Sequence, residues 1–103
     1  MMGQLIRTAL ACVLVFGMSA VQADVETGRA KAKMCVVCHG EFGISMLPNA
    51  PNLAGQPQDY LARQLRDFRD GKRPATIMHQ ISKGLTEDQI VAVSAYWSAQ
   101  KAK

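Results

Sequence analysis

The sequence predicts a small all-α domain made of a few amphipathic helices. Two stretches repeat apolar residues at helical spacing, and no alternation of strands and helices is found. The repeats are Leu61, Leu65 and Phe68 in the first stretch and Ile90, Val93, Tyr96 and Trp97 in the second. A third observation, a cysteine–histidine motif near the start of the domain, indicates what these helices enclose.

Residues 1–23 are predicted to be a cleavable signal peptide. A basic residue charges their start, and residues 9–16 form an apolar run too short to span a bilayer. Small or apolar residues within 21–23 suit a signal peptidase, so we expect cleavage before Asp24. The mature chain, residues 24–103, is then one periplasmic domain without stable membrane insertion. A retained N-terminal anchor is the alternative.

The charge of the mature domain argues against nucleic acid as a partner. The whole chain has 12 basic and 8 acidic residues, and losing Arg7 with the signal peptide leaves a net charge of +3. We would expect a denser basic stripe in a nucleic-acid-binding protein. Cys12 also leaves, so the remaining cysteines form one motif and no separate disulfide framework.

The mature N-terminus, residues 25–35, is predicted to be a helix that leads into this motif, because Ala30 and Ala32 favour helix. Gly28 inside it costs about 1 kcal/mol relative to alanine. A close crossing with another helix explains a glycine there, and a plain helix start is the alternative. Packing of this helix against the last one would close the fold.

The run Cys-Val-Val-Cys-His at residues 35–39 is the attachment pattern of a c-type haem. The thiols of Cys35 and Cys38 can each add to a haem vinyl group, and His39 is placed to ligate the iron. A zinc site needs four protein ligands, or three plus water, and beyond this motif the mature chain offers only one more histidine, His79. A redox dithiol is expected beside a βαβ pattern, which is missing. We therefore predict three to four main helices wrapped around one covalently attached haem c.

Between residues 41 and 57 the chain loses helical and strand spacing. The breaks are Gly43, Pro48, Pro51, Gly55 and Pro57. Such a long irregular run is unusual in a compact domain, so its apolar residues are expected to line a flat prosthetic group. These residues are Phe42, Ile44, Met46, Leu47 and Leu53. An ordinary covered loop is the alternative.

Residues 58–70 are predicted to form the next helix, with Pro57 at its first turn and Gly71 just past its end. Its basic residues resemble a docking patch for an acidic partner: Arg63, Arg66, Arg69, Lys72 and Arg73. The i,i+4 pairs Asp59/Arg63, Arg63/Asp67 and Arg66/Asp70 instead favour an ordinary solvated face.

Residues 75–83, stopped by Gly84, are predicted to supply the second iron ligand. A methionine sulfur opposite histidine raises the potential of an electron-transfer haem. Met78 is the favoured ligand, because the chain behind it is long enough to reach the distal face. His79 and Met46 are its rivals.

The last helix begins at a capping box, with Thr86 as N-cap and Gln89 three residues later. Its apolar positions face the core. We expect Trp97 to be a core residue rather than a functional one.

Several of these segments together resemble class I cytochrome c. They are the Cys-Val-Val-Cys-His-Gly motif, Pro51-Asn52-Leu53-Ala54-Gly55-Gln56, Tyr60-Leu61, Gln64-Leu65, Phe68, Met78 and the helix start at 85–90. The resemblance covers nearly all of residues 24–103. It implies an all-α fold with haem in a crevice, thioethers at Cys35 and Cys38, and axial ligands His39 and Met78. It also implies that the carbonyl of Pro51 accepts a hydrogen bond from the proximal histidine.

A narrower resemblance joins residues 75–84 to the cytochrome subunit of flavocytochrome c sulfide dehydrogenase. It implies a non-catalytic subunit that accepts electrons from an FAD-containing flavoprotein and passes them to another redox protein. The better-known subunit carries two haems, whereas this chain has one motif and no flavin-binding glycine motif. The alternative is a free diffusible carrier between respiratory complexes. No catalytic residue is assigned, and Met78 argues against haem sensing or peroxidase chemistry.

Overall fold

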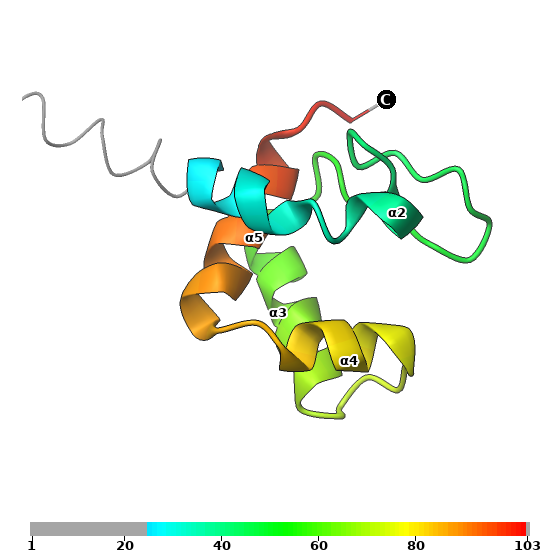
Figure 1. The fold of residues 1–103 in the computed structure, drawn as a ribbon, viewed down its shortest axis with the longest axis vertical. Coiled ribbons are helices and arrows are strands. Elements are labelled where there is room, and N and C mark those ends of the chain that lie inside the picture. The colour runs from blue at the N-terminus through cyan, green and yellow to red at the C-terminus, as the bar shows by residue number, and fades with distance from the viewer. Residues whose placement is uncertain (1–24, 103) are drawn as a thin grey trace, which may run out of the picture.

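The computed structural model describes residues 25–102, which form an all-α fold without β-strands (Figure 1). The labelled helices are α2 (Val36–His39), α3 (Gln58–Arg69), α4 (Ile77–Lys83) and α5 (Glu87–Ala99). A further helix over residues 25–32, called here the N-terminal helix, precedes α2. No helix in this part of the chain has the length and apolar character needed to cross a membrane. The predicted signal peptide lies outside the described residues.

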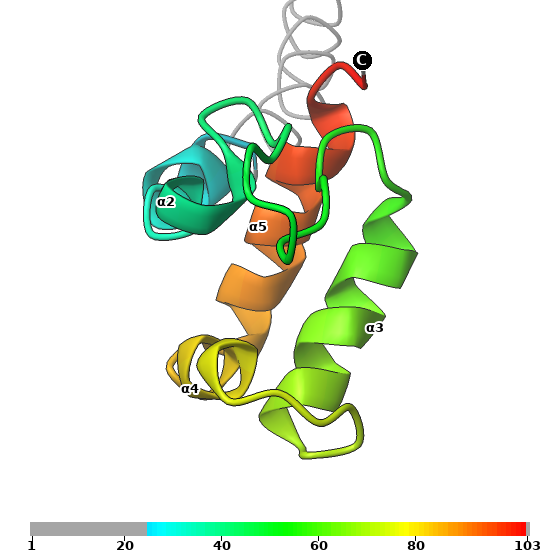
Figure 2. The ribbon, with the colours of Figure 1, turned by 90° about the vertical axis from the view of Figure 1, so that its right-hand side faces the viewer.

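Helix α5 is the element on which the others pack. Figure 2 shows α3 beside α5, α4 at the lower end of the pair, and α2 with the 41–57 loop at the upper end. The main core draws one residue from the N-terminal helix, one from α3 and three from α5: Ala32, Leu61, Val93, Tyr96 and Trp97. The expectation that Trp97 belongs to the core is confirmed, since it is 1% exposed.

Gly28 marks the predicted crossing of the N-terminal helix over α5. A Cβ atom on Gly28 would lie 2.0 Å from the backbone oxygen of Ala92 and 2.8 Å from Cβ of Tyr96. Since no ordinary contact is that short, only glycine lets the two backbones meet here. The prediction that the first and last helices pack together is therefore confirmed, and the glycine explains how closely they do so.

The ends of the later helices agree with the sequence signals. At the start of α5, Oγ1 of Thr86 accepts from the amide of Gln89 at 3.1 Å, and the Gln89 side chain accepts from the Thr86 amide at 3.0 Å. This is the predicted capping box. Pro57 is the N-cap of α3, and Gly71 follows its end with φ of 76°.

Two expectations differ from the structure. The N-terminal helix stops at residue 32, where the amide of Cys35 donates to the carbonyl of Ala32 at 2.8 Å in a tight turn. The aspartate–arginine pairs expected along residues 58–70 are not ion-paired among the described residues. Instead, Arg66 and Arg69 reach α5 and bind Glu87 at 2.5 and 2.8 Å. Arg69 also binds Asp70, the next residue in the chain, at 2.9 Å.

Candidate haem attachment site

The attachment segment, residues 35–39, is one short turn of helix between two reversals of the chain. The amide of His39 donates to the carbonyl of Cys35 at 2.9 Å, so both cysteines and the histidine lie on the same turn. Both thiols are free and half-buried. Gly40 ends the turn with φ of 88°, and a Cβ there would lie 2.0 Å from the Ile44 oxygen. The chain can therefore leave the segment at once.

His39 is held by one specific hydrogen bond. Its Nδ1 lies 2.8 Å from the carbonyl oxygen of Pro51, and the residue is 7% exposed. Because a carbonyl only accepts, Nδ1 must carry the proton, and Nε2 keeps a lone pair free to bind a metal. Such a partner on the other ring nitrogen fixes both tautomer and ring orientation.

The 41–57 loop is irregular, as predicted, but it is tied together by its own backbone. The amides of Leu53 and Ala54 both donate to the carbonyl of Gly43, at 2.8 and 3.1 Å. Oγ of Ser45 donates to the carbonyl of Cys38 at 3.1 Å, and the Ser45 amide donates to Asn52 at 2.7 Å. These contacts fix the position of Pro51 relative to His39.

Sequence reasoning missed the role of Ser45 and Asn52 in this loop. Both residue types bond readily to nearby backbone, which is the only signal that the sequence carries for them. Their partners are defined by the shape of the loop and not by a fixed spacing.

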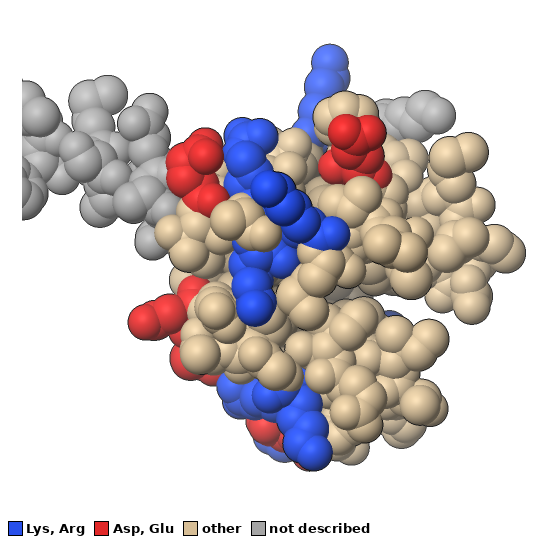
Figure 3. Space-filling model, viewed as in Figure 1, with Lys and Arg blue, Asp and Glu red and all other residues tan. Residues whose placement is uncertain are grey.

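Helix α4 lies across a hollow from the attachment segment. In Figure 3 the surface is hollowed at the right, between the upper part of the molecule with α2 and the lower part with α4, and the flanking side chains are mostly uncharged. Met78 stands on α4 and is half-buried. Its rival Met46 is 95% exposed.

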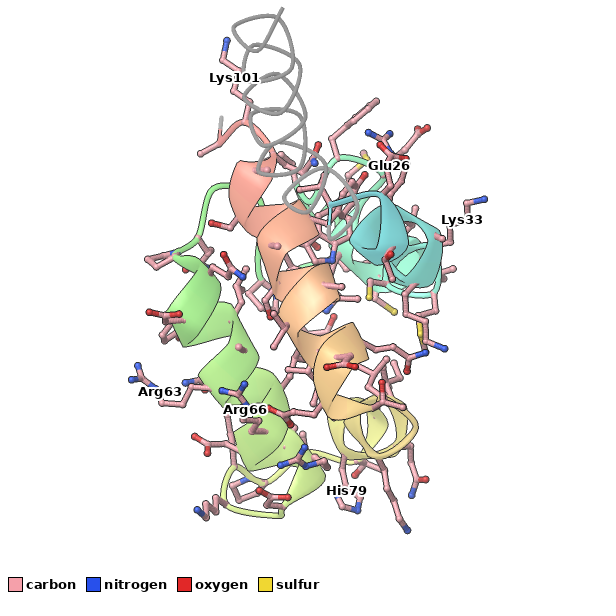
Figure 4. The ribbon with its side chains drawn as sticks, turned by 90° about the vertical axis from the view of Figure 1, so that its left-hand side faces the viewer. Glu26, Lys33, Arg63, Arg66, His79 and Lys101 are labelled. Atoms are coloured by element: carbon pink, nitrogen blue, oxygen red, sulfur yellow. The ribbon has the colours of Figure 1, made fainter. Side chains whose placement is uncertain are left out.

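The second rival, His79, is engaged elsewhere. Its Nδ1 lies 2.7 Å from the carbonyl oxygen of Phe68, so the side chain ties α4 to the end of α3. Figure 4 shows His79 at the lower edge of the molecule, pointing away from the N-terminal helix and the attachment segment. His79 therefore stabilises the packing of α4 against the end of α3.

The thiol of Cys35 borders the main core. Burial raises the pKa of Cys35, while the indole N–H of Trp97 acts on the sulfur in the opposite direction. Nε1 of Trp97 is buried and has no hydrogen-bond partner among the described residues. Sequence reasoning missed this neighbour, although a buried indole that needs an acceptor was a usable signal.

The donor set fits a covalently attached haem. Two free thiols lie on one turn, and the adjacent imidazole has its second nitrogen free because the first is bonded to Pro51. A thioether stands on the other side of the hollow, on α4. Within residues 25–102 no three His, Cys, Asp or Glu residues gather into a cluster that could hold a metal by themselves.

Comparison with known proteins agrees with this fit. Residues 25–100 match the family "Cytochrome c". The chain is 36% identical over 100 residues to cytochrome c4 of Pseudomonas aeruginosa. This alignment covers 97% of the chain and 50% of that cytochrome c4. It is 37% identical over 81 residues to cytochrome c-554(548) of Halomonas halodenitrificans, covering 76% of this chain and 98% of that one.

A third relative is the thiosulfate dehydrogenase electron acceptor of Thiomonas intermedia, 40% identical over 72 residues, covering 69% of this chain and 33% of that protein. Among solved structures, reduced recombinant cytochrome c4 from Pseudomonas stutzeri superposes with a TM-score of 0.74 at 29% identity, over 78% of this chain and 50% of that one. The chain thus spans about half the length of the cytochromes c4 that it matches. With its all-α fold of class I type, and haem c as the covalently bound cofactor of that family, the chain belongs to the cytochrome c family.

Proposed function

We propose that the chain is a periplasmic one-haem electron carrier in which Cys35 and Cys38 hold the haem through thioethers and His39 ligates the iron through Nε2. The hydrogen bond from His39 Nδ1 to Pro51 is the observation that carries this assignment. This hydrogen bond leaves Nε2 of His39 free to bind the iron and fixes the orientation of the ring, on the same turn as the two free thiols. Haem c, when bound, supplies a one-electron iron couple.

Met78 is proposed as the distal ligand. It is half-buried on α4, across the hollow from the attachment segment, while Met46 is almost fully exposed. His79 is bonded to Phe68 and directed away. A methionine sulfur opposite histidine favours the ferrous state and raises the reduction potential.

Substitution of Met78 tests this assignment on the holoprotein. Met78→Ala should abolish the methionine-to-ferric-iron charge-transfer band and lower the reduction potential. Met46→Ala and His79→Gln are matched controls that should keep the band. If the band survives in Met78→Ala and disappears in one of the controls, that control residue is the ligand and our assignment is wrong.

A freely diffusing carrier is the form of this function that the relatives favour. The relatives reported above are named cytochromes c4, a cytochrome c-554(548) and an electron acceptor. In this proposal the chain exchanges electrons with other redox proteins after export, following cleavage before Asp24. The uncharged side chains that flank the hollow supply a contact surface through which an electron can pass without a bound substrate.

The second candidate function is to accept electrons from a dehydrogenase that oxidises reduced sulfur compounds. The electron acceptor of thiosulfate dehydrogenase in Thiomonas intermedia supports it, as does the resemblance of residues 75–84 to the cytochrome subunit of flavocytochrome c sulfide dehydrogenase. In the latter form, an FAD-containing subunit would donate the electrons.

Mild purification of the native protein separates the two candidates. The haem-to-flavin ratio of the peak is measured, and the peak is tested for haem reduction by sulfide and by thiosulfate. A flavin-free monomer that neither compound reduces promptly supports the free carrier. A ratio near one to one with sulfide-driven reduction supports the flavocytochrome subunit and contradicts the free carrier.

A further inference from the structure

We propose that the indole N–H of Trp97 is a positioning group that bonds the sulfur of the Cys35 thioether and raises the haem reduction potential. The proposal rests on the haem attachment proposed above. It gives a chemical task to a residue that sequence reasoning assigned only to the core.

The first step is that the indole N–H is buried without a partner. Trp97 is 1% exposed, and its Nε1 meets no hydrogen-bond acceptor of suitable geometry among the described residues. A buried donor without a partner destabilises the folded state, because it has lost its hydrogen bond to water. Because tryptophan has no acceptor of its own and buried indoles usually find one, the position calls for an acceptor beside it.

The second step is that Trp97 cannot turn away to find another acceptor. A Cβ on Gly43 would lie 2.8 Å from Cε3 of the indole, so the loop backbone lies directly on the ring. Tyr96 meets the ring edge to face, with 4.9 Å between centroids. The amide of Gly55 donates to the Trp97 carbonyl at 3.0 Å, which fixes the backbone as well.

The third step is that the sulfur of Cys35 is the acceptor that we assign to this donor once the haem is attached. The cysteine packs against the cluster that contains Trp97. Burial raises the pKa of the Cys35 thiol, and the Trp97 indole partly offsets this rise. That is the effect expected of a hydrogen-bond donor beside the sulfur. After haem attachment the sulfur is bonded to two carbon atoms and carries no proton. Both of its lone pairs can then accept a hydrogen bond. A thioether sulfur is a weak acceptor, but here it has no water to compete with the indole.

The expected sign follows from charge. The N–H dipole presents its positive end to a sulfur that is bonded to the edge of the macrocycle. The ferric state carries one more positive charge than the ferrous state, so this dipole disfavours it in a site of low dielectric.

Trp97→Phe in the holoprotein is the first test, because it keeps an aromatic ring and removes the N–H. We expect the equilibrium constant for reduction to fall about two- to fivefold, a drop of about 20–40 mV at 59 mV per tenfold for one electron. Tyr96→Phe, on the neighbouring position of α5, is the matched control and should leave the potential unchanged. An unchanged potential in Trp97→Phe would overturn the proposal.

A second measurement decides the matter if Trp97→Phe does not fold. The chain has 1 tryptophan, so its indole N–H gives one unambiguous nuclear magnetic resonance signal in the diamagnetic ferrous protein. Cys35→Ala should shift this signal and speed its exchange with solvent more than Cys38→Ala does, since both variants lose one thioether but only the first loses the acceptor. Equal effects of the two substitutions would contradict the contact with Cys35. Absence of covalent haem from the unsubstituted protein would instead contradict the proposed function.

Discussion

Replacing Gly28 by alanine is the sharpest test of how the fold is closed. The added Cβ would lie 2.0 Å from the Ala92 oxygen and 2.7 Å from the Ala92 carbonyl carbon. Both are backbone atoms of α5, so no side chain can rotate out of the way. The N-terminal helix must move off α5, and the packing of Ala32 against Val93 and Trp97 is loosened with it.

The magnitude follows from two opposing effects. Overpacking of this kind costs about 1–3 kcal/mol and occasionally more. Alanine returns about 0.5–1 kcal/mol through its better helix propensity. Since the clash is with backbone, we take the upper part of the first range and expect a net loss of about 2 kcal/mol. For a domain of this size that lowers Tm by about 8–16 °C.

Thermal unfolding of the holoprotein, followed by far-ultraviolet circular dichroism, measures this loss. Gly84→Ala is the matched control, because Gly84 has φ of −83° and its added Cβ would meet only the Ile81 oxygen at 3.6 Å. That variant should be neutral or slightly more stable. Equal or higher Tm in Gly28→Ala would refute the inference that the two backbones touch at this glycine.

Three further predictions concern the surface, the α5 cap and the attachment. Glu87→Gln should lower Tm at neutral pH, because Arg69 and Arg66 hold the pKa of Glu87 below its usual 4.5; its carboxylate stabilises the fold above that pH and loses the effect as pH falls. The difference from the unsubstituted protein should shrink in high salt and vanish in acid, and a pH-independent difference would contradict the ion pairs. Thr86→Ala should cost about 1 kcal/mol through loss of the cap, seen in denaturant unfolding, while Thr86→Ser should restore most of it. Cys35→Ala with Cys38→Ala should leave no haem on the protein after acid–acetone extraction, and haem retained by the double variant would disprove attachment at these thiols.

Local signals in the sequence predicted local structure well. The capping box at Thr86 and the stops at Gly71 and Gly84 involve residues within a few positions of one another, so their spacing carries the whole interaction. The apolar repeats of α3 and α5 likewise identified buried residues such as Leu61 and Ile90. Helical periodicity reports on one face of one helix, and that face is what these elements bury.

Contacts between distant segments could not be predicted in the same way. Spacing along residues 58–70 favoured partners within the helix, whereas Glu87, 18 and 21 residues beyond Arg69 and Arg66, takes both arginines. The neighbourhood of Cys35 and Trp97 depends on where the last helix crosses the first. No spacing along the chain carries the distance of that crossing, although Gly28 correctly indicated that a crossing exists.

The N-terminal helix and the 41–57 loop, which flank the attachment segment, both pack on α5, and α5 is the last of the described helices to be synthesised. Gly28 rests on Ala92 and Gly43 rests on Trp97, so neither the N-terminal helix nor the 41–57 loop has its supporting surface until the last helix has been made. Both segments therefore depend on contacts with residues more than 50 positions later in the chain, and such long-range contacts form late in folding. Since Cys35 packs against the core that α5 completes, its thiol is more accessible to haem before α5 docks than in the closed domain.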